Sequence, residues 1–115
     1  MVLGARARAW DENGSRRDKG GILIYGSEDK RKWKLYQKIV PERAFGYMWE
    51  CPDIFYLGEK KVLSFCPQGL DAEQERFQNL YQSGYSLLDE SENPEDTFQE
   101  WDMGFDFYAP QTFQA

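Results

Sequence analysis

Residues 48–55 read Met48-Trp49-Glu50-Cys51-Pro52-Asp53-Ile54-Phe55, and an apolar stretch continues from them. The change from an acidic, proline-containing run to β-branched and aromatic residues predicts a strand over 53–57 with Glu50 at its entrance. The tight turn 58–60 leads into a second strand over 61–66, which Pro67-Gln68-Gly69 is expected to stop. This stretch therefore predicts an antiparallel hairpin.

The same alternation of short apolar runs and turn residues extends in both directions. Further strands are expected at 2–9, 22–25, 32–40, 81–88, 97–102 and from 105 onward, and loops are expected at 11–21, 71–78 and 89–96. Strands about ten residues apart, with Gly and Pro at the breaks, are typical of an all-β fold. The four-strand set over 53–102 matches one antiparallel blade of a β-propeller.

Composition excludes several classes of function. The chain has 115 residues, a net charge of −6 and a pI of about 4.7, so it has no electrostatic reason to bind nucleic acid or an anionic membrane. The sequence has no histidine, which excludes Ser-His-Asp and Cys-His catalysis and most zinc sites. No apolar run reaches the length of a membrane span, and the start is too short for a signal peptide, so we expect a cytoplasmic chain.

Two cysteines, Cys51 and Cys66, lie fifteen residues apart and would sit on neighbouring strands. Without a secretory signal we expect free thiols rather than a disulfide. Four arginines in the first 17 residues suggest a phosphate site, but a solvated strand face and loop is the favoured interpretation.

Glu50 is the candidate for acid–base chemistry. If Trp49 and Cys51 exclude water from one side of its carboxyl group, desolvation raises its pKa toward the range that a general acid needs. The plainer alternative is a strand-edge glutamate beside a core tryptophan, and residue chemistry alone favours that alternative.

Four stretches resemble glycoside hydrolase family 32, the β-fructofuranosidases, and within it the bacterial sucrose-6-phosphate hydrolases. In the family's order they are Met1-Val2-Leu3-Gly4-Ala5, the run 47–53 with its Glu-Cys-Pro-Asp motif, the run 62–69, and the run 102–112 with its Asp-Phe-Tyr-Ala-Pro-Gln-Thr motif. The resemblance covers essentially the whole chain. It implies a five-bladed catalytic propeller, of which this chain would be roughly two blades: the last three strands of one blade at 1–40, a full blade at 47–102, and the first strand of the next at 105–115.

The resemblance also implies a retaining glycosidase acting on sucrose or sucrose-6-phosphate. Glu50 matches the family's acid/base. Cys51 is its usual neighbour, would modulate the environment of that carboxyl group, and is also a substrate-binding candidate. The motif that holds Asp102 and Asp106 lies near the substrate-binding end of the pocket in relatives, which makes these two substrate-binding candidates. Trp49 and Tyr108 are further candidates, as platforms that stack on sugar, although core packing is the more ordinary role of such residues.

Two of the family's motifs are absent from the sequence. The nucleophile belongs to an Asn-Asp-Pro-Asn motif and a transition-state-stabilising aspartate to an Arg-Asp-Pro motif, and neither occurs here. We therefore expect these 115 residues alone not to hydrolyse sucrose, whereas the parent protein would. The family needs no cofactor, and the sequence has no metal-ligand spacing.

Two alternatives remain at this point. One is a non-catalytic carbohydrate-binding or structural β module, which the absent nucleophile favours. The other is a related furanosidase propeller acting on arabinan-type substrates, which ranks low because those families lack the Trp-Glu-Cys-Pro-Asp run. With either function, two blades leave sheet edges open, so we expect self-association.

Overall fold

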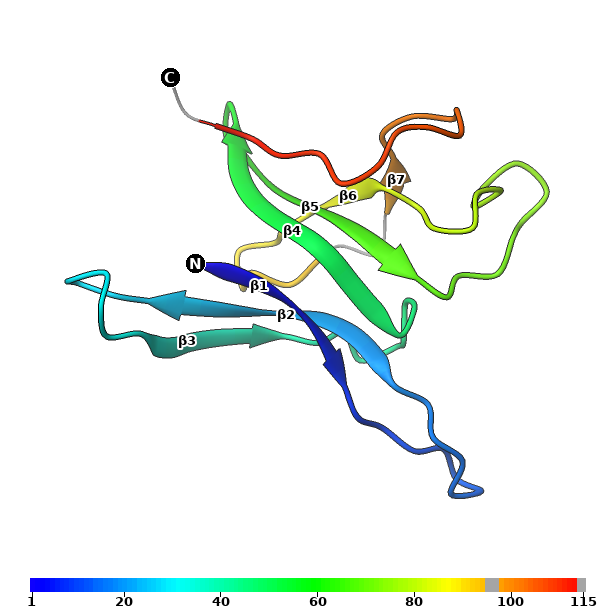
Figure 1. Ribbon diagram of the computed structural model, residues 1–115, viewed down its shortest axis with the longest axis horizontal. Coiled ribbons are helices and arrows are strands. Elements are labelled where there is room, and N and C mark those ends of the chain that lie inside the picture. The colour runs from blue at the N-terminus through cyan, green and yellow to red at the C-terminus, as the bar shows by residue number, and fades with distance from the viewer. Residues whose placement is uncertain (95–97, 114–115) are drawn as a thin grey trace.

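The first three strands form an antiparallel sheet in the order β1-β2-β3 in the computed structural model, which describes residues 1–94 and 98–113 (Figure 1). The strands are β1 (Val2–Ala7), β2 (Lys19–Gly26) and β3 (Lys34–Ile39). Small residues and alternating apolar positions allow β1 and β2 to pair without interruption from Val2↔Ile24 to Ala7↔Lys19.

The second sheet is four-stranded and antiparallel, in the order β4-β5-β6-β7. Its strands are β4 (Met48–Leu57), β5 (Lys60–Gln68), β6 (Gly84–Leu87) and β7 (Gln99–Glu100). The all-β prediction is confirmed by these two antiparallel sheets. Among the described residues, no helix is long and apolar enough to cross a membrane.

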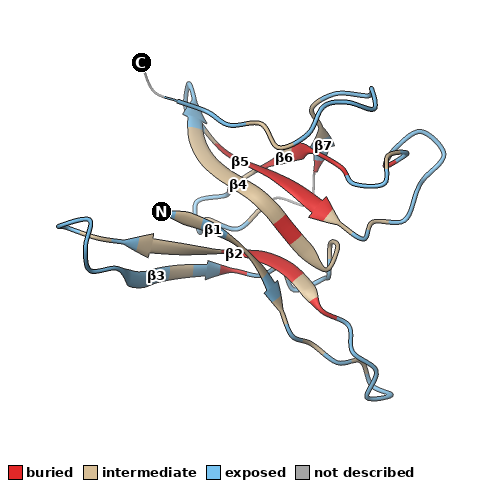
Figure 2. Ribbon diagram, viewed as in Figure 1, coloured by how far each residue is buried: buried red, intermediate tan, exposed pale blue. Residues whose placement is uncertain are grey.

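The core lies between the two sheets, where β1 and β2 pack on β4 (Figure 2). Trp49 and Phe65 stack with ring centroids 4.2 Å apart, and Phe98 lies 5.0 Å from Phe65. Each such buried aromatic side chain contributes about 1.5–3 kcal/mol to folding. Two glycines permit the close approach: a Cβ on Gly4 would lie 2.0 Å from the Trp49 carbonyl oxygen, and one on Gly20 would lie 2.3 Å from the Trp49 ring.

Several strand boundaries differ from the sequence prediction. β4 begins at Met48 rather than at residue 53, so the Glu50 motif lies inside the strand. β5 continues through Pro67, which pairs with Trp49 near the end of the strand, where one missing N–H is tolerated. β6 and β7 are shorter than the strands expected at 81–88 and 97–102. Thr97, the predicted start of the second of these, lies outside the described residues.

The strand expected to begin at Phe105 is not present over residues 105–113. This segment runs extended beside the second sheet and reaches it through side chains, not through a backbone ladder (Figure 1). A strand requires a neighbouring strand for its backbone groups, and the described residues after 104 contain none.

Candidate active site

A β-bulge in β4 determines which way Glu50 points. Glu50 pairs with Cys66 and Asp53 pairs with Ser64, so three steps along β4 match two steps along β5. Cys66 and Ser64, two residues apart, lie on one face of the sheet, and therefore Glu50 and Asp53 share that face despite their odd spacing. The bulge holds Cys51 at φ +47°, a left-handed conformation that is rare for residues other than glycine.

Tyr108 brings the C-terminal segment to Glu50. Its phenol donates a hydrogen bond of 2.7 Å to Glu50 Oε2, across 58 residues of sequence. Burial, followed by the hydrogen bond and charge of Glu50, raises the pKa of the Tyr108 phenol well above its ordinary value. The phenol is therefore a fixed donor at neutral pH. Two of the residues that the sequence singled out are in direct contact.

The thiol of Cys51 lies beside this pair and is half-buried. Burial raises its pKa, and the neighbouring Cys66 and Glu50 act in the same direction. Both cysteines are free thiols. In the part of the chain that the structure describes, no three His, Cys, Asp or Glu side chains gather closely enough to hold a metal ion.

Trp49 does not belong to this site: of the two roles considered for it, the structure shows core packing and not the sugar platform. Its side chain is 1% exposed in the core between the sheets, and its Nε1 donates to the Phe45 carbonyl oxygen at 2.7 Å. Neighbouring residues of a strand point to opposite faces, so the indole cannot shield the Glu50 carboxylate. The shielding that the sequence analysis expected from Trp49 is thus not available.

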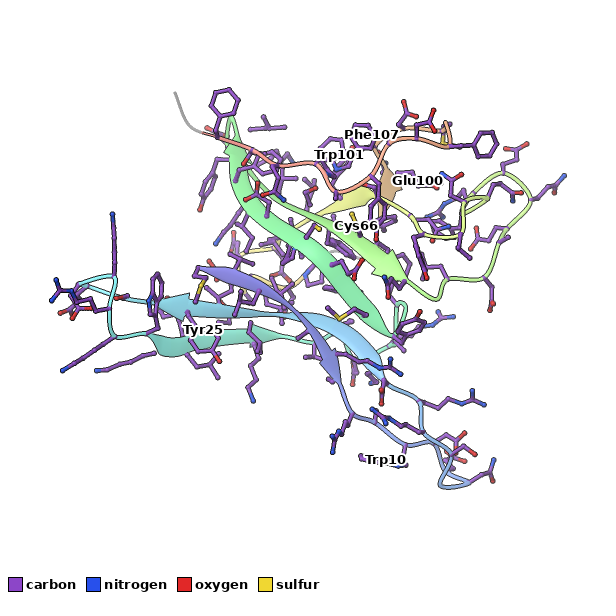
Figure 3. The ribbon with its side chains drawn as sticks, in the orientation of Figure 1. Trp10, Tyr25, Cys66, Glu100, Trp101 and Phe107 are labelled. Atoms are coloured by element: carbon purple, nitrogen blue, oxygen red, sulfur yellow. The ribbon has the colours of Figure 1, made fainter. Side chains whose placement is uncertain are left out.

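Asp102 and Asp106 lie in the exposed loop after β7, close to the labelled Trp101 and Phe107 (Figure 3). Asp102 accepts a hydrogen bond of 2.7 Å from the Gly104 N–H, which is a local turn contact. Within the described residues, no hydrogen bond or ion pair joins either aspartate to Glu50.

Two site residues received no role in the sequence analysis, although both lie in the quoted motifs. They are Asp53 and Thr112. Asp53 Oδ2 accepts one hydrogen bond from the Thr112 N–H at 3.0 Å and another from the Thr112 hydroxyl at 2.5 Å. Only the structure shows that the second motif lies along the first.

An open groove of about 380 Å³ adjoins Tyr108. Exposed aromatic side chains dominate its lining, and the Tyr81 ring centroid lies 6.4 Å from that of Tyr108. The other aromatic residues are Phe105 and Phe107. Tyr108 thus lines this groove and also donates a hydrogen bond to Glu50.

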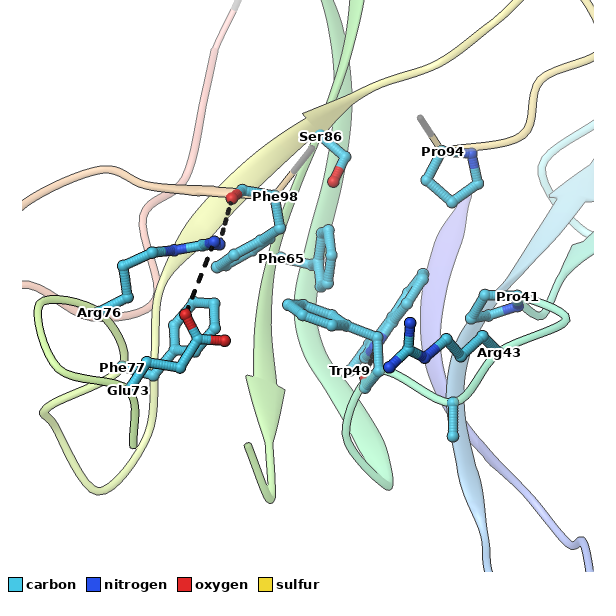
Figure 4. A pocket seen from close by; sticks show the side chains of 12 residues that line it. Pro41, Arg43, Trp49, Phe65, Glu73, Arg76, Phe77, Ser86, Pro94 and Phe98 are labelled. Carbon is cyan, nitrogen blue, oxygen red and sulfur yellow. Dashed lines mark hydrogen bonds and ion pairs between the residues drawn. The ribbon is translucent and has the colours of Figure 1, made fainter. Parts of the chain in front are cut away.

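A separate cavity of about 370 Å³ lies where the connector 41–45 and the loop 73–77 meet the second sheet, and it is lined by core aromatics and Arg76 (Figure 4). Arg76 donates to the Phe98 carbonyl oxygen at 2.9 Å there. Glu50 is not among the lining residues. Pro94 and Phe98, in its wall, flank residues 95–97, which lie outside the described part of the chain.

The N-terminal arginines neutralise carboxylates. Arg6 and Arg16 contact the buried carboxylate of Asp18 at 2.5 and 2.8 Å, and Arg17 contacts Asp11 at 3.3 Å. The hydrogen bond from Arg16 is the main cause that holds the pKa of Asp18 far below its usual range. Arg6, Arg16 and Arg17 are therefore engaged in ion pairs within the chain, two of them with the same buried carboxylate, whereas the favoured interpretation was a solvated strand face and loop.

Comparison with known proteins identifies the family. The model of the glycosyl hydrolases family 32 N-terminal domain matches residues 11–115. The chain belongs to glycosyl hydrolase family 32. The resemblance in the sequence motifs is thereby confirmed.

Relatives within family 32 agree with this membership. The chain is 48% identical over 99 residues to the sucrose-6-phosphate hydrolase of Staphylococcus xylosus, covering 82% of this chain and 20% of that protein. It is 42% identical over 123 residues to that of Bacillus subtilis (strain 168), covering 99% of this chain and 24% of that protein. The chain therefore spans a quarter or less of the length of these two relatives.

Solved family 32 structures have the same fold. A Bombyx mori β-fructofuranosidase mutant in complex with sucrose superimposes with a TM-score of 0.76 at 35% identity, covering 99% of this chain and 25% of that one. The sucrose-6-phosphate hydrolase of Lactobacillus gasseri gives a TM-score of 0.69 at 33% identity, covering 94% and 22%.

Proposed function

We propose that this chain supplies the acid/base part of a β-fructofuranosidase that hydrolyses sucrose or sucrose-6-phosphate. The observation that carries the proposal is the hydrogen bond from Tyr108 to Glu50, which joins the two most specific family 32 motifs in one site. The names of the relatives, sucrose-6-phosphate hydrolases and a β-fructofuranosidase in complex with sucrose, support the substrate class.

The roles follow from retaining glycoside chemistry. Glu50 donates a proton to the leaving glycosidic oxygen, and its carboxylate then takes a proton from the attacking water. Tyr108 occupies Oε2, so we assign the proton transfer to Oε1. Cys51 contributes packing but no negative charge, because its raised pKa keeps the thiol protonated at neutral pH.

The aromatic groove beside Tyr108 is assigned to the leaving-group half of the substrate. An acid/base must reach the glycosidic oxygen, so a groove that shares Tyr108 with it lies beside the group being released. Tyr81 and Phe107, both partly exposed, offer ring faces to a sugar. Asp102 and Asp106, in the adjacent loop, remain proposed substrate contacts.

The nucleophile comes from outside these 115 residues. The Asn-Asp-Pro-Asn motif is absent, so we propose that the isolated chain forms no glycosyl-enzyme intermediate and releases no sugar. In this assignment, residues 1–40 form the last three strands of one blade, 47–102 a full blade, and 105–115 enter the next.

A chimera tests the acid/base role. This chain replaces the matching segment of the Staphylococcus xylosus sucrose-6-phosphate hydrolase, and each variant is assayed on sucrose-6-phosphate and on β-fructosyl fluoride. Fluoride departs without a proton, so Glu50→Gln should lose at least about 100-fold on the sugar phosphate and far less on the fluoride. Glu59→Gln, in the exposed turn between β4 and β5, is the matched control. Equal losses on both substrates would refute the acid role.

A second candidate function is binding of carbohydrate without turnover. The groove of exposed aromatics favours it for the chain as it stands. It predicts saturable binding of sucrose that Tyr81→Ala abolishes and Glu50→Gln leaves intact, measured by calorimetry. No binding at millimolar sucrose would eliminate it.

We also propose that the isolated chain associates with copies of itself. Residues 1–47 hold 11 Lys and Arg against 6 Asp and Glu, a net +5, whereas residues 48–115 hold 3 against 14, a net −11. The edge strand β3 carries basic residues beside Tyr36, which is 76% exposed, so it complements the acidic sheet of a second copy.

Light scattering over a concentration series tests this association. Mass should rise with concentration in dilute salt, and 0.5 M salt or Tyr36→Lys should reduce it, because exposed charges are screened. A monomer at every concentration in dilute salt would contradict it.

The proposed compartment is the cytoplasm, since free thiols are usual in reducing surroundings.

A further inference from the structure

Asp53 holds the C-terminal segment by a two-part contact. One carboxylate oxygen, Oδ2, accepts from both the N–H and the hydroxyl of Thr112. Hydrogen bonds to an ionised acceptor are about twice as strong as neutral ones, so this is the firmest polar contact described between the segment and β4. The bulge in β4 makes it possible, because Asp53 would otherwise face the core side of the sheet.

The segment is thus attached to β4 at two points, Tyr108 on Glu50 and Thr112 on Asp53. Tyr108 contacts Glu50 and the later Thr112 contacts the later Asp53, so the segment runs parallel to β4. Between the two attachments, Ala109 has φ +51°, a conformation that costs on the order of 1 kcal/mol for a residue with a Cβ. Such a conformation persists only where the surroundings hold both sides of it.

We propose that Asp53 is a positioning residue for Glu50: by fixing Thr112 it sets where the phenol of Tyr108 meets the carboxylate. Asp53 acts through the segment and touches neither Glu50 nor substrate. The catalytic meaning rests on the proposed acid/base function, whereas the structural coupling does not.

Ionisation of Tyr108 reports the coupling in the 115-residue chain without any activity assay. Chains with 13C at tyrosine Cζ are titrated by NMR, and Tyr108→Phe identifies the Tyr108 signal among the seven tyrosines. In the unmodified 115-residue chain Tyr108 should remain protonated at pH 11, because burial and the hydrogen bond to Glu50 raise the pKa of its phenol. Asp53→Ala releases the segment, so Tyr108 should ionise by pH 11, toward the ordinary value near 10.

Graded variants separate positioning from loss of folding. Thr112→Val keeps the N–H bond to Asp53 and loses the hydroxyl bond, so it should shift Tyr108 less than Asp53→Ala. Asp53→Asn retains an acceptor oxygen and should restore part of the effect. Asp29→Ala is the matched control: Asp29 accepts two backbone N–H groups in the β2–β3 turn of the other sheet, and its loss should leave Tyr108 unchanged. Circular dichroism verifies that each variant is folded.

Two results distinguish failure of this inference from failure of the proposed function. An unchanged Tyr108 titration in Asp53→Ala overturns the positioning role whether or not the chimera is active. A shifted titration supports it, even if Glu50→Gln in the chimera keeps full hydrolysis and so refutes the acid/base assignment. In an active chimera, Asp53→Ala should lower kcat about tenfold or more with little change in KM.

Discussion

The contact between β1 and β4 makes Gly4→Ala the most informative single substitution for the fold. The added Cβ would lie 2.0 Å from the Trp49 carbonyl oxygen, whereas ordinary contact begins at 3.4 Å, so the two strands must separate by about 1.4 Å. The obstacle is backbone and cannot rotate away. Overpacking of this kind costs about 1–3 kcal/mol, and the reduced entropy of the unfolded chain returns about 0.4–1 kcal/mol. Because the clash is severe, we expect the upper end of the overpacking cost, so that the free energy of unfolding falls by a net value of about 2 kcal/mol.

Urea unfolding followed by tryptophan fluorescence measures this loss, since Trp49 lies at the contact. With a slope of about 1–3 kcal/mol per molar urea, the midpoint should fall by about 1 M. The control is Gly26→Ala in β2, where the added Cβ meets nothing within 4 Å. The urea midpoint of Gly26→Ala should equal that of the unmodified chain or be slightly higher. Equal midpoints for the two variants would refute the close-packing argument.

Three further changes test other parts of the structure. Asp18→Asn should lower the urea midpoint at pH 7, and its difference from the unmodified chain should shrink progressively as the pH falls below about 4. The stabilisation from a depressed folded pKa is complete above the unfolded pKa, declines below it, and is lost as the pH falls through the folded pKa. Cys51 should react with iodoacetamide at pH 7 more slowly than free cysteine, as peptide mass spectrometry would show, since burial raises the pKa of its thiol; an equal rate would contradict this. Trp101→Phe should cost about 1–2 kcal/mol in urea unfolding by removing the 3.0 Å bond to the buried Ser64 hydroxyl, and adding Ser64→Ala should restore part of that loss.

The sequence predicts the strand order and the hairpins well because turn residues and alternation are local signals. The run 22–25 predicts the centre of β2, and the loop predicted at 71–78 has no strand in the structure. The ends of β4 and β5 were missed because Pro52 and Pro67 are ordinary strand breakers, and here pairing and a bulge accommodate them. Rules based on local sequence cannot predict that strand pairing or a bulge will accommodate a proline.

The candidate site was predictable in its residues and not in its contacts. Glu50, Cys51 and Tyr108 lie together, although Tyr108 was considered only as a sugar platform or a core residue and not as a hydrogen-bond donor to Glu50. Trp49 was expected beside the Glu50 carboxylate because the strand was predicted to begin only at residue 53; in β4 the two neighbours point to opposite faces, and Trp49 takes the core side. The partnership of Asp53 with Thr112 spans 59 residues, a separation at which no periodicity operates.

The bulge at Cys51 has a consequence for changes in chain length. Deleting one residue between Glu50 and Asp53 would give a regular ladder, with all backbone partners in step. The side chains on both flanks would keep their faces, because Glu50 and Asp53 would then lie two positions apart, opposite Cys66 and Ser64 as before. An insertion of one residue would instead enlarge the bulge or shift the pairing of one flank by two positions. The extra residue at Cys51 therefore sets the local bend and twist of β4 beside the Glu50 carboxylate, and the alignment of that carboxylate can change while Trp49 stays in the interior.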